Sequence, residues 1–146
     1  APVSGELVHL ENTNDPAFSS RAVGDGVAVV PQEGTVCAPV SGTVAALFPT
    51  EHALGIMSDD SSAQVMLHIG IDTVKLEGKG FHALVAQGDH VDAGQPLVEV
   101  DFDAVRAAGF DPTVFVIVCE RSENSTLREH ASGPVAVKEP VVWLSE

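Results

Sequence analysis

The sequence predicts an all-β protein, an antiparallel hybrid of β-sandwich and β-barrel with one or two short helical turns. Turn signals built from glycine, proline and small polar residues recur about every 8–12 residues, a spacing typical of sandwiches and barrels. Residues 1–5 (APVSG) are repeated at 38–42, and a β-type stretch follows each copy, which indicates an internal duplication. Alternation of strands with helices, the sign of a parallel α/β sheet, is absent.

The length of 146 residues corresponds to a single domain, residues 1–146. The first residue is alanine rather than methionine, so we expect a domain excised from a longer protein or a processed chain. No run approaches the length of a membrane span, so we expect no insertion of this domain into a membrane. A cytoplasmic location is a separate expectation.

Runs rich in β-branched and aromatic residues, bounded by turn residues, define the expected elements. Residues 11–21 are polar and loop-like, and 24–26 (GDG) is a tight turn. One short helix is expected at 103–108, ended by Gly109, and a helical turn at 122–129. Pro140 indicates an edge position for the last strand. The expected strands are 27–31, 35–38, 42–48, 65–76, 81–86, 91–92, 96–100, 113–119, 135–137 and 141–144.

The fold is organised around the apolar stretch 65–76 (VMLHIGIDTVKL), which contains one histidine, His68. The two-residue period of a strand would place Met66, His68, Gly70 and Asp72 on one face and the residues between them on the other. A lone histidine on an apolar strand is most often a core residue bonded to a carbonyl. A second apolar stretch, 48–56 (FPTEHALGI), contains His52, which favours a functional pair.

The net charge of −14 disfavours nucleic acids and anionic membrane surfaces as partners, because both would be repelled. Cys37 and Cys119 lie among apolar β-forming residues, and we expect small buried thiols in a reducing compartment. Whether they form a disulfide is left open by the sequence.

Phosphoryl transfer is the first chemistry that fits two histidines in such a domain. A neutral imidazole accepts the phosphoryl group through its lone pair, and a second histidine stabilises the phosphoryl oxygens. A third group should hold the other nitrogen of each ring and select its tautomer. The Thr50 hydroxyl, two residues before His52, and the Gly70 carbonyl, two residues after His68, are the expected holders.

Two alternatives remain at this point. A zinc hydrolase would use His52, His68 and a carboxylate as ligands, although the common HExxH and HxH spacings are absent. A biotinyl-like or lipoyl-like carrier domain is suggested by APVSGTV and GDHVDAGQPLVEV, but Lys75 and Lys79 lie outside the tight hairpin in which such domains present a lysine. Three further histidines lie in polar turns, where we expect them to be exposed: His82, His90 and His130.

Six stretches in order closely resemble the glucose-type enzyme IIA of the bacterial phosphoenolpyruvate-dependent sugar phosphotransferase system: APVSGELV, VGDGVAV, APVSGTV, FPTEHALGI, HIGIDTVKLEGKGF and GDHVDAGQPL. They cover nearly the whole chain. The resemblance implies an antiparallel β-sandwich or barrel hybrid and a phosphocarrier without a cofactor. It implies that the domain takes a phosphoryl group from the histidine protein HPr and passes it to the cysteine of a IIB domain. The sugar, and whether the domain is free-standing or tethered to a membrane permease, stay open.

The same motifs carry the family's functional residues onto this chain. The phosphorylated histidine falls on His68, the assisting histidine on His52 and its threonine partner on Thr50. Two acids near the site fall on Asp72 and Asp15. Pro49 departs from the family pattern, where it could displace the threonine hydroxyl. We also expect an apolar rim for partner docking, made of Phe18, Val23, Phe48 and Met66.

Overall fold

The computed structural model describes residues 2–10, 13, 25–32, 34–59, 63–71, 73–121, 126–129, 133–135 and 142–145. Almost all regular structure in this part of the chain is β-strand. Its helical elements include the 3₁₀ helix η2 (Thr73–Leu76) and the helix α2 (Phe102–Ala107). The strands are β1 (Gly5–His9), β2 (Asp25–Pro31), β3 (Thr35–Cys37), β4 (Gly42–Leu47), β5 (Ala53–Ser58), β6 (Ala63–Ile69), β7 (Phe81–Ala83), β8 (His90–Val91), β9 (Pro96–Val100), β10 (Val114–Arg121), β11 (Thr126–Glu129), β12 (Gly133–Val135) and β13 (Val142–Ser145).

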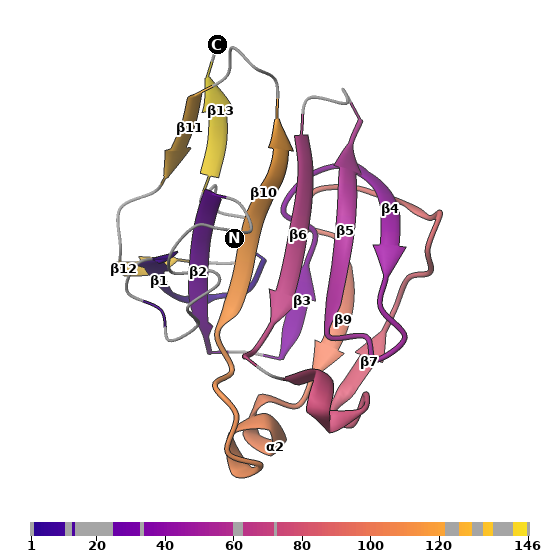
Figure 1. Ribbon diagram of the computed structural model, residues 1–146, viewed down its shortest axis with the longest axis vertical. Coiled ribbons are helices and arrows are strands. Elements are labelled where there is room, and N and C mark those ends of the chain that lie inside the picture. The colour runs from indigo at the N-terminus through magenta and orange to yellow at the C-terminus, as the bar shows by residue number, and fades with distance from the viewer. Residues whose placement is uncertain are drawn as a thin grey trace.

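The described strands form one large antiparallel sheet and two small ones. The large sheet has the order β12-β1-β2-β10-β6-β5-β4-β8, the second has the order β3-β9-β7, and β11 pairs with β13. In Figure 1 the β3-β9-β7 sheet lies behind the β6-β5-β4 part of the large sheet. The predicted antiparallel all-β fold of the sandwich and barrel type is confirmed.

Alternation along the strands divides the apolar side chains between the two faces of the large sheet. On β10, Val114, Val116 and Val118 belong to the main core, while Phe115 and Ile117 belong to a smaller cluster on the other face. The main core also takes side chains from β3, β7 and β9, so it fills the space between the two sheets. We call the other group the second cluster; it consists of Leu10, Ala28, Phe115 and Ile117, with Val8, Met66 and Ile71 packed against it.

The repeated APVSG stretch forms the same local structure twice. Gly5 begins β1 and Gly42 begins β4, and in both cases an added Cβ would come within about 2 Å of a carbonyl oxygen of the antiparallel partner strand. The serine carbonyl before each glycine accepts a hydrogen bond from the residue that follows the partner strand. The two bonds run from Gln32 N to Ser4 O (2.8 Å) and from Asp59 N to Ser41 O (3.1 Å). These matching contacts support the predicted internal duplication.

The predicted strand 65–76 is wrong beyond Ile69, where β6 ends. Gly70 has φ +78°, which turns the chain out of the extended conformation, and Thr73–Leu76 form η2. Gly70 therefore does not continue the face of His68 as a strand residue. Ile71, expected on the opposite face from His68, packs against the second cluster, on the same face as Met66.

Two further expectations are corrected. The turn at 24–26 is wrong for Asp25 and Gly26, which belong to β2; Gly24 lies outside the described residues. Glycine is required at 26 because a Cβ would come within 1.9 Å of the Val116 carbonyl oxygen. The helical turn expected at 122–129 is wrong for Thr126–Glu129, which form β11 through pairing with β13; residues 122–125 are not described.

The other elements lie close to their expected positions. Strand 96–100 is observed as β9, and the helix expected at 103–108 is α2, where the Asp101 carboxylate accepts a hydrogen bond from Ala104 N (3.0 Å). Strand 81–86 is shorter than expected and ends at Ala83. The expected strand 141–144 overlaps β13, whereas the expected strand 135–137 shares only Val135 with β12; residues 136, 137 and 141 lie outside the described part. Cys37 is buried, as expected. The side chain of Cys119, together with His130 and Pro140, lies outside the described part.

Candidate functional site

His68 lies on the face of β6 that is turned away from the main core. Along β6 the odd-numbered positions 63–69 are buried, whereas Gln64, Met66 and His68 are half-buried. His68 is directly opposite Ala53 on β5 and Phe115 on β10. Its ring centroid lies 6.3 Å from that of Phe115 in an edge-to-face arrangement. The histidine is thus held between two central strands with one side of its ring against an aromatic side chain.

The Gly70 carbonyl holds one nitrogen of His68, as the spacing predicted. His68 Nδ1 lies 2.7 Å from Gly70 O. A carbonyl oxygen only accepts hydrogen bonds, so Nδ1 carries a proton, and in the neutral ring the lone pair is on Nε2. The positive φ of Gly70 makes this contact possible, because it folds the chain back just after the strand ends.

His52 is presented by the loop between β4 and β5. A turn from Phe48 to Glu51 closes this loop: Glu51 N donates to Phe48 O (2.8 Å), and Phe48 N donates to Ala53 O (3.0 Å). Glu51 adopts φ +62°, and its carboxylate accepts a hydrogen bond from Ala83 N on β7 (3.2 Å). The loop is therefore fastened to a strand of the second sheet.

Thr50 contacts His52 as predicted, and Pro49 does not prevent the contact. The Thr50 hydroxyl oxygen lies 2.5 Å from His52 Nδ1. His52 is buried, and the backbone carbonyl of His52 accepts a hydrogen bond from Ile69 N (2.8 Å), which joins the loop to the end of β6. Because Thr50 occupies Nδ1 of His52, the other ring nitrogen, Nε2, is the one that can contact a further partner.

The two imidazole rings face each other edge to face. Their centroids are 5.1 Å apart and their planes make an angle of 82°. Burial, and secondly the charge that the His68 ring can carry, lower the pKa of His52 from its usual 6.5 to about 4. His52 is therefore neutral at physiological pH, with one ring nitrogen as donor and the other as acceptor.

Apolar side chains surround the pair. Phe48 is 45% exposed and packs edge to face on His52, with ring centroids 5.5 Å apart. Met66, on the same face of β6 as His68, packs against the second cluster. Phe115 was not predicted as a neighbour, because only the register between β6 and β10 brings it opposite His68. Four predicted site residues lie outside the described residues: Asp15, Phe18, Val23 and Asp72.

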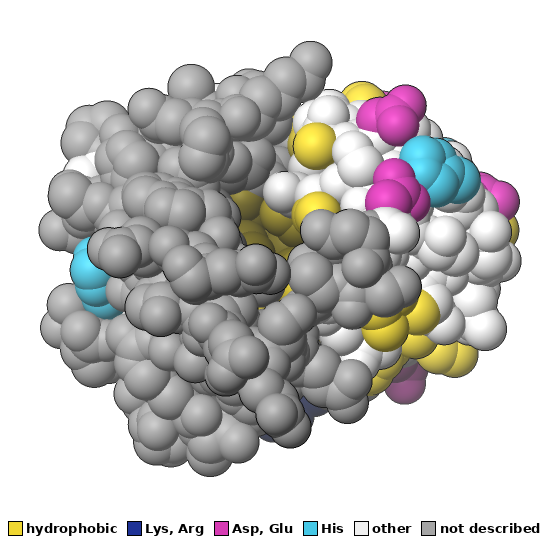
Figure 2. All heavy atoms as spheres, turned by 90° about the horizontal axis from the view of Figure 1, so that it is seen from above, with side chains coloured by type: hydrophobic (Ala, Val, Ile, Leu, Met, Phe, Trp, Pro, Cys, Tyr) yellow, Lys and Arg dark blue, Asp and Glu magenta, His cyan; other side chains and the backbone are white. Residues whose placement is uncertain are grey.

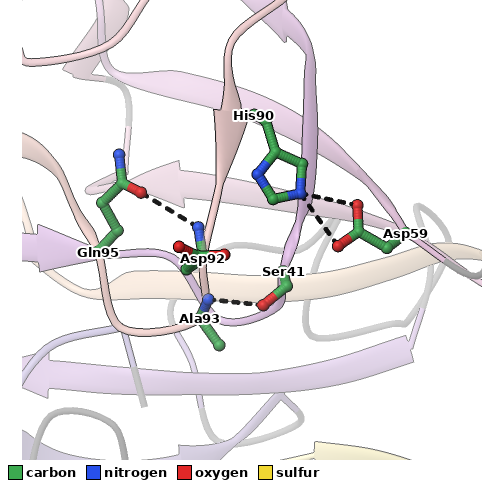
Figure 3. A network of polar contacts seen from close by, with 6 residues as sticks. All are labelled: Ser41, Asp59, His90, Asp92, Ala93 and Gln95. Atoms are coloured by element: carbon green, nitrogen blue, oxygen red, sulfur yellow. Dashed lines mark hydrogen bonds and ion pairs between the residues drawn. The ribbon is translucent and has the colours of Figure 1, made fainter.

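Two of the other histidines are exposed, as expected, but they lie on strands rather than in turns. His82 is on β7 and His90 on β8. His90 Nε2 lies 3.0 Å from both carboxylate oxygens of Asp59, and nearby Ala93 N donates to Ser41 Oγ at 2.8 Å (Figure 3). The Asp59 carboxylate, by its hydrogen bond and then its charge, raises the pKa of His90. Figure 2 shows acidic side chains flanking a histidine on the described part of the upper end.

No group of three histidine, cysteine, aspartate or glutamate side chains in the described residues is arranged to hold a metal ion. Within the same residues, no helix is long and apolar enough to cross a membrane. The two described site histidines form a pair in which each Nδ1 is already bonded within the chain.

A family model described as phosphoenolpyruvate-dependent sugar phosphotransferase system, EIIA 1, matches residues 1–124. The chain belongs to this family. It is therefore a phosphotransferase component with a phosphocarrier role, and neither a zinc hydrolase nor a biotinyl or lipoyl carrier is supported.

Similar proteins of known structure or sequence support this family assignment. The glucose permease IIA from Mycoplasma capricolum has a similar structure, with a TM-score of 0.89, 35% identity, and 97% of this chain and 91% of that chain covered. The glucose-specific EIICBA component of Streptococcus pneumoniae is 43% identical over 94% of this chain and 19% of that protein. The beta-glucoside-specific EIIBCA component of Bacillus subtilis is 42% identical over 99% of this chain and 24% of that protein. The chain thus spans about a fifth to a quarter of the length of these multidomain relatives.

Proposed function

We propose that His68 is the residue that carries the phosphoryl group, on Nε2. The observation that supports this most directly is the contact between His68 Nδ1 and the Gly70 carbonyl, which leaves the lone pair on Nε2. When the group arrives, an Nε2–P bond forms and the bond between phosphorus and the donor breaks. Catalysis of this step depends mainly on position and on stabilisation of the phosphoryl oxygens.

His52 supplies that stabilisation. Its ring is neutral and lies beside His68, and a Thr50 hydroxyl that donates to Nδ1 leaves the proton on Nε2. That N–H then donates to the phosphoryl oxygens. The negative charge of a bound phosphoryl group raises the pKa of His52, so the ring strengthens its stabilisation when the charge arrives.

The donor in this proposal is HPr, and the acceptor is the cysteine of the IIB domain of a sugar permease. The EIICBA and EIIBCA designations of the relatives support a IIB acceptor, because these names join IIA, IIB and IIC in one component. With a net charge of −14, docking is favoured for partners with a basic or apolar surface around their reactive residue. We place this exchange on the cytoplasmic side of a permease.

Phosphorylation with phosphoenolpyruvate and the general phosphotransferase proteins, HPr included, tests the assignment. We expect an acid-labile, base-stable phosphate on the parent protein and none on the His68→Ala variant. The His82→Ala variant is the matched control, because it removes an exposed histidine from β7. Mass spectrometry that locates the phosphate on another histidine would show the assignment to be wrong.

A further inference from the structure

The residues just after β6 pair with an irregular piece of chain just before β10. Ile69 is directly opposite Val114, and Gly70 N donates to Thr113 O at 2.8 Å, which continues the ladder. In a regular antiparallel ladder the next hydrogen bond to Asp111 O would come from residue 72, but here it comes from Ile71 N, at 2.9 Å. Pro112 is therefore an extra residue between two paired ones, the arrangement of a β-bulge.

This bulge determines where the Gly70 carbonyl points. The carbonyl of Gly70 and the N–H of Ile71 belong to one peptide group, so fixing the N–H on Asp111 O fixes the carbonyl on the other side. That carbonyl is the acceptor of His68 Nδ1–H. A continuous chain of hydrogen bonds thus runs from the His68 ring through one peptide group to the Asp111 backbone, and such chains polarise one another.

The Asp111 side chain holds the bulge in shape. Its Oδ1 accepts two hydrogen bonds from Thr113, one from the backbone N at 2.9 Å and one from the hydroxyl at 2.5 Å. Thr113 is 6% exposed and Asp111 is half-buried, so these bonds are partly screened from water. The two bonds span Pro112 and set the relative positions of the 111 and 113 carbonyls, which are the two acceptors of the 70–71 segment.

We propose that Asp111 is a positioning residue for phosphoryl transfer: its carboxylate fixes the bulge that aims the Gly70 carbonyl at His68 and so keeps the proton on Nδ1. This rests on the proposed role of His68. Asp111 acts through Thr113 and the Gly70–Ile71 peptide rather than on the phosphoryl group. Without the carboxylate, the carbonyl loses its fixed direction, and the Nε2–H tautomer, which has no lone pair on Nε2, becomes populated.

The decisive measurement is the tautomer of His68 in the unphosphorylated protein. Nitrogen-15 NMR of protein labelled at histidine distinguishes Nδ1–H from Nε2–H in the neutral ring, without any phosphoryl donor. We expect the Nδ1–H form in the parent and a mixture of both in Asp111→Ala. The rate of phosphorylation of Asp111→Ala should fall about tenfold, as expected for the loss of hydrogen bonds to a charged acceptor.

Matched variants separate positioning from a general loss of structure. Asp111→Asn keeps an acceptor oxygen, and we expect the parent tautomer and a rate within about threefold of the parent. Asp103→Ala removes the same charge from an exposed side chain on α2 and should change neither readout. Thr113→Val removes only the hydroxyl donor and should give a tautomer mixture between those of the parent and Asp111→Ala.

The proposal is overturned if Asp111→Ala keeps the parent tautomer, whatever its rate, or if its tautomer shifts without a change in rate. If Asp111→Ala does not fold, Thr113→Val decides in the same way. Failure of the proposed function looks different: the phosphate of the parent protein would then be mapped to a residue other than His68.

Discussion

The two site histidines are held by different groups, and this gives them different behaviour toward protons. The His68 Nδ1 bonds to a carbonyl, which can only accept, whereas the His52 Nδ1 bonds to a hydroxyl, which can also donate. Because burial lowers the pKa of His52 to about 4, the folded protein keeps this ring neutral where an unfolded chain would protonate it.

The low pKa of His52 predicts a specific dependence of stability on pH. Between pH 6.5 and 4 the unfolded chain binds a proton at His52 that the folded protein does not bind, so the free energy of unfolding falls as the pH falls through this window. Below pH 4 this contribution becomes constant. Its full size is at most about 3 kcal/mol. Urea denaturation of the unphosphorylated protein at a series of pH values measures it.

The control for this experiment is His52→Gln, which retains all carboxylates. The difference between the two unfolding curves should therefore isolate the histidine, and the variant should lose less stability than the parent between pH 6.5 and 4. Parallel pH dependences for both proteins would show that the pKa of His52 is not lowered in the folded state.

His52→Gln also separates loading of His68 from discharge. The amide can keep one hydrogen bond to the phosphoryl group but cannot become cationic, and donors aimed at developing charge are worth about 10²–10³ in rate. We expect the variant to accept phosphate at His68 and to pass it to a IIB partner far more slowly. A two-stage assay with labelled donor scores both steps. Discharge at the parent rate would remove His52 from the mechanism.

At the scale of elements, the junction between β6 and η2 forms the His68 side of the site. Gly70 has φ +78°, and an added Cβ would lie 2.4 Å from Thr73 Cγ2 and 3.0 Å from Asp111 O. The Thr73 hydroxyl in turn donates to the Ile69 carbonyl. A side chain at position 70 would therefore collide with Thr73 and with the Asp111 carbonyl, so only glycine fits there.

We predict that Gly70→Ala destabilises the fold by about 2–3 kcal/mol, from both the left-handed φ and the clash with Thr73. Gly109→Ala is the matched control: Gly109 has φ +89°, but a Cβ there would meet nothing within 4 Å, so only the cost of the conformation, about 1 kcal/mol, is expected. Thermal or urea unfolding compares the two. Equal losses would mean that the close contacts at Gly70 relax without cost.

Local patterns predicted the fold class, β9, α2 and the contacts of Thr50 and Gly70 with the two rings, because each depends on residues a few positions apart. Local patterns failed where the conformation of a segment depends on pairing with residues far away in the sequence. The run 65–76 is mostly apolar, and its alternation does not reveal that Gly70 takes a positive φ. Thr126–Glu129 is polar and is extended only because β13 pairs with it.

In the site, too, local contacts were predicted and long-range contacts were missed. The pairing of His68 with Phe115, the fastening of Glu51 to β7 and the bulge at Pro112 all join segments more than 30 residues apart in sequence. No local spacing indicates such contacts, because they follow from the register between strands that are assembled only in the folded sheet.

For the molecule as a whole, we predict that metal removal leaves phosphoryl transfer intact. A catalytic zinc site takes three protein ligands, and both Nδ1 atoms of the pair are already bonded within the chain. Transfer rates measured before and after treatment with a strong chelator check this. A loss of activity that added Zn²⁺ restores would contradict the expectation and favour a metal-dependent mechanism.

β10 lies in the middle of the large sheet, between β2 and β6, although it comes late in the chain. During synthesis on a ribosome, both neighbours therefore leave the exit tunnel long before the strand that joins them. Until Val114–Arg121 arrives, each neighbour has an unpaired edge, which is the kind of surface that invites association with other chains. The proposed phosphoryl site is completed by the same event, because Phe115 and the Asp111 bulge come with that strand.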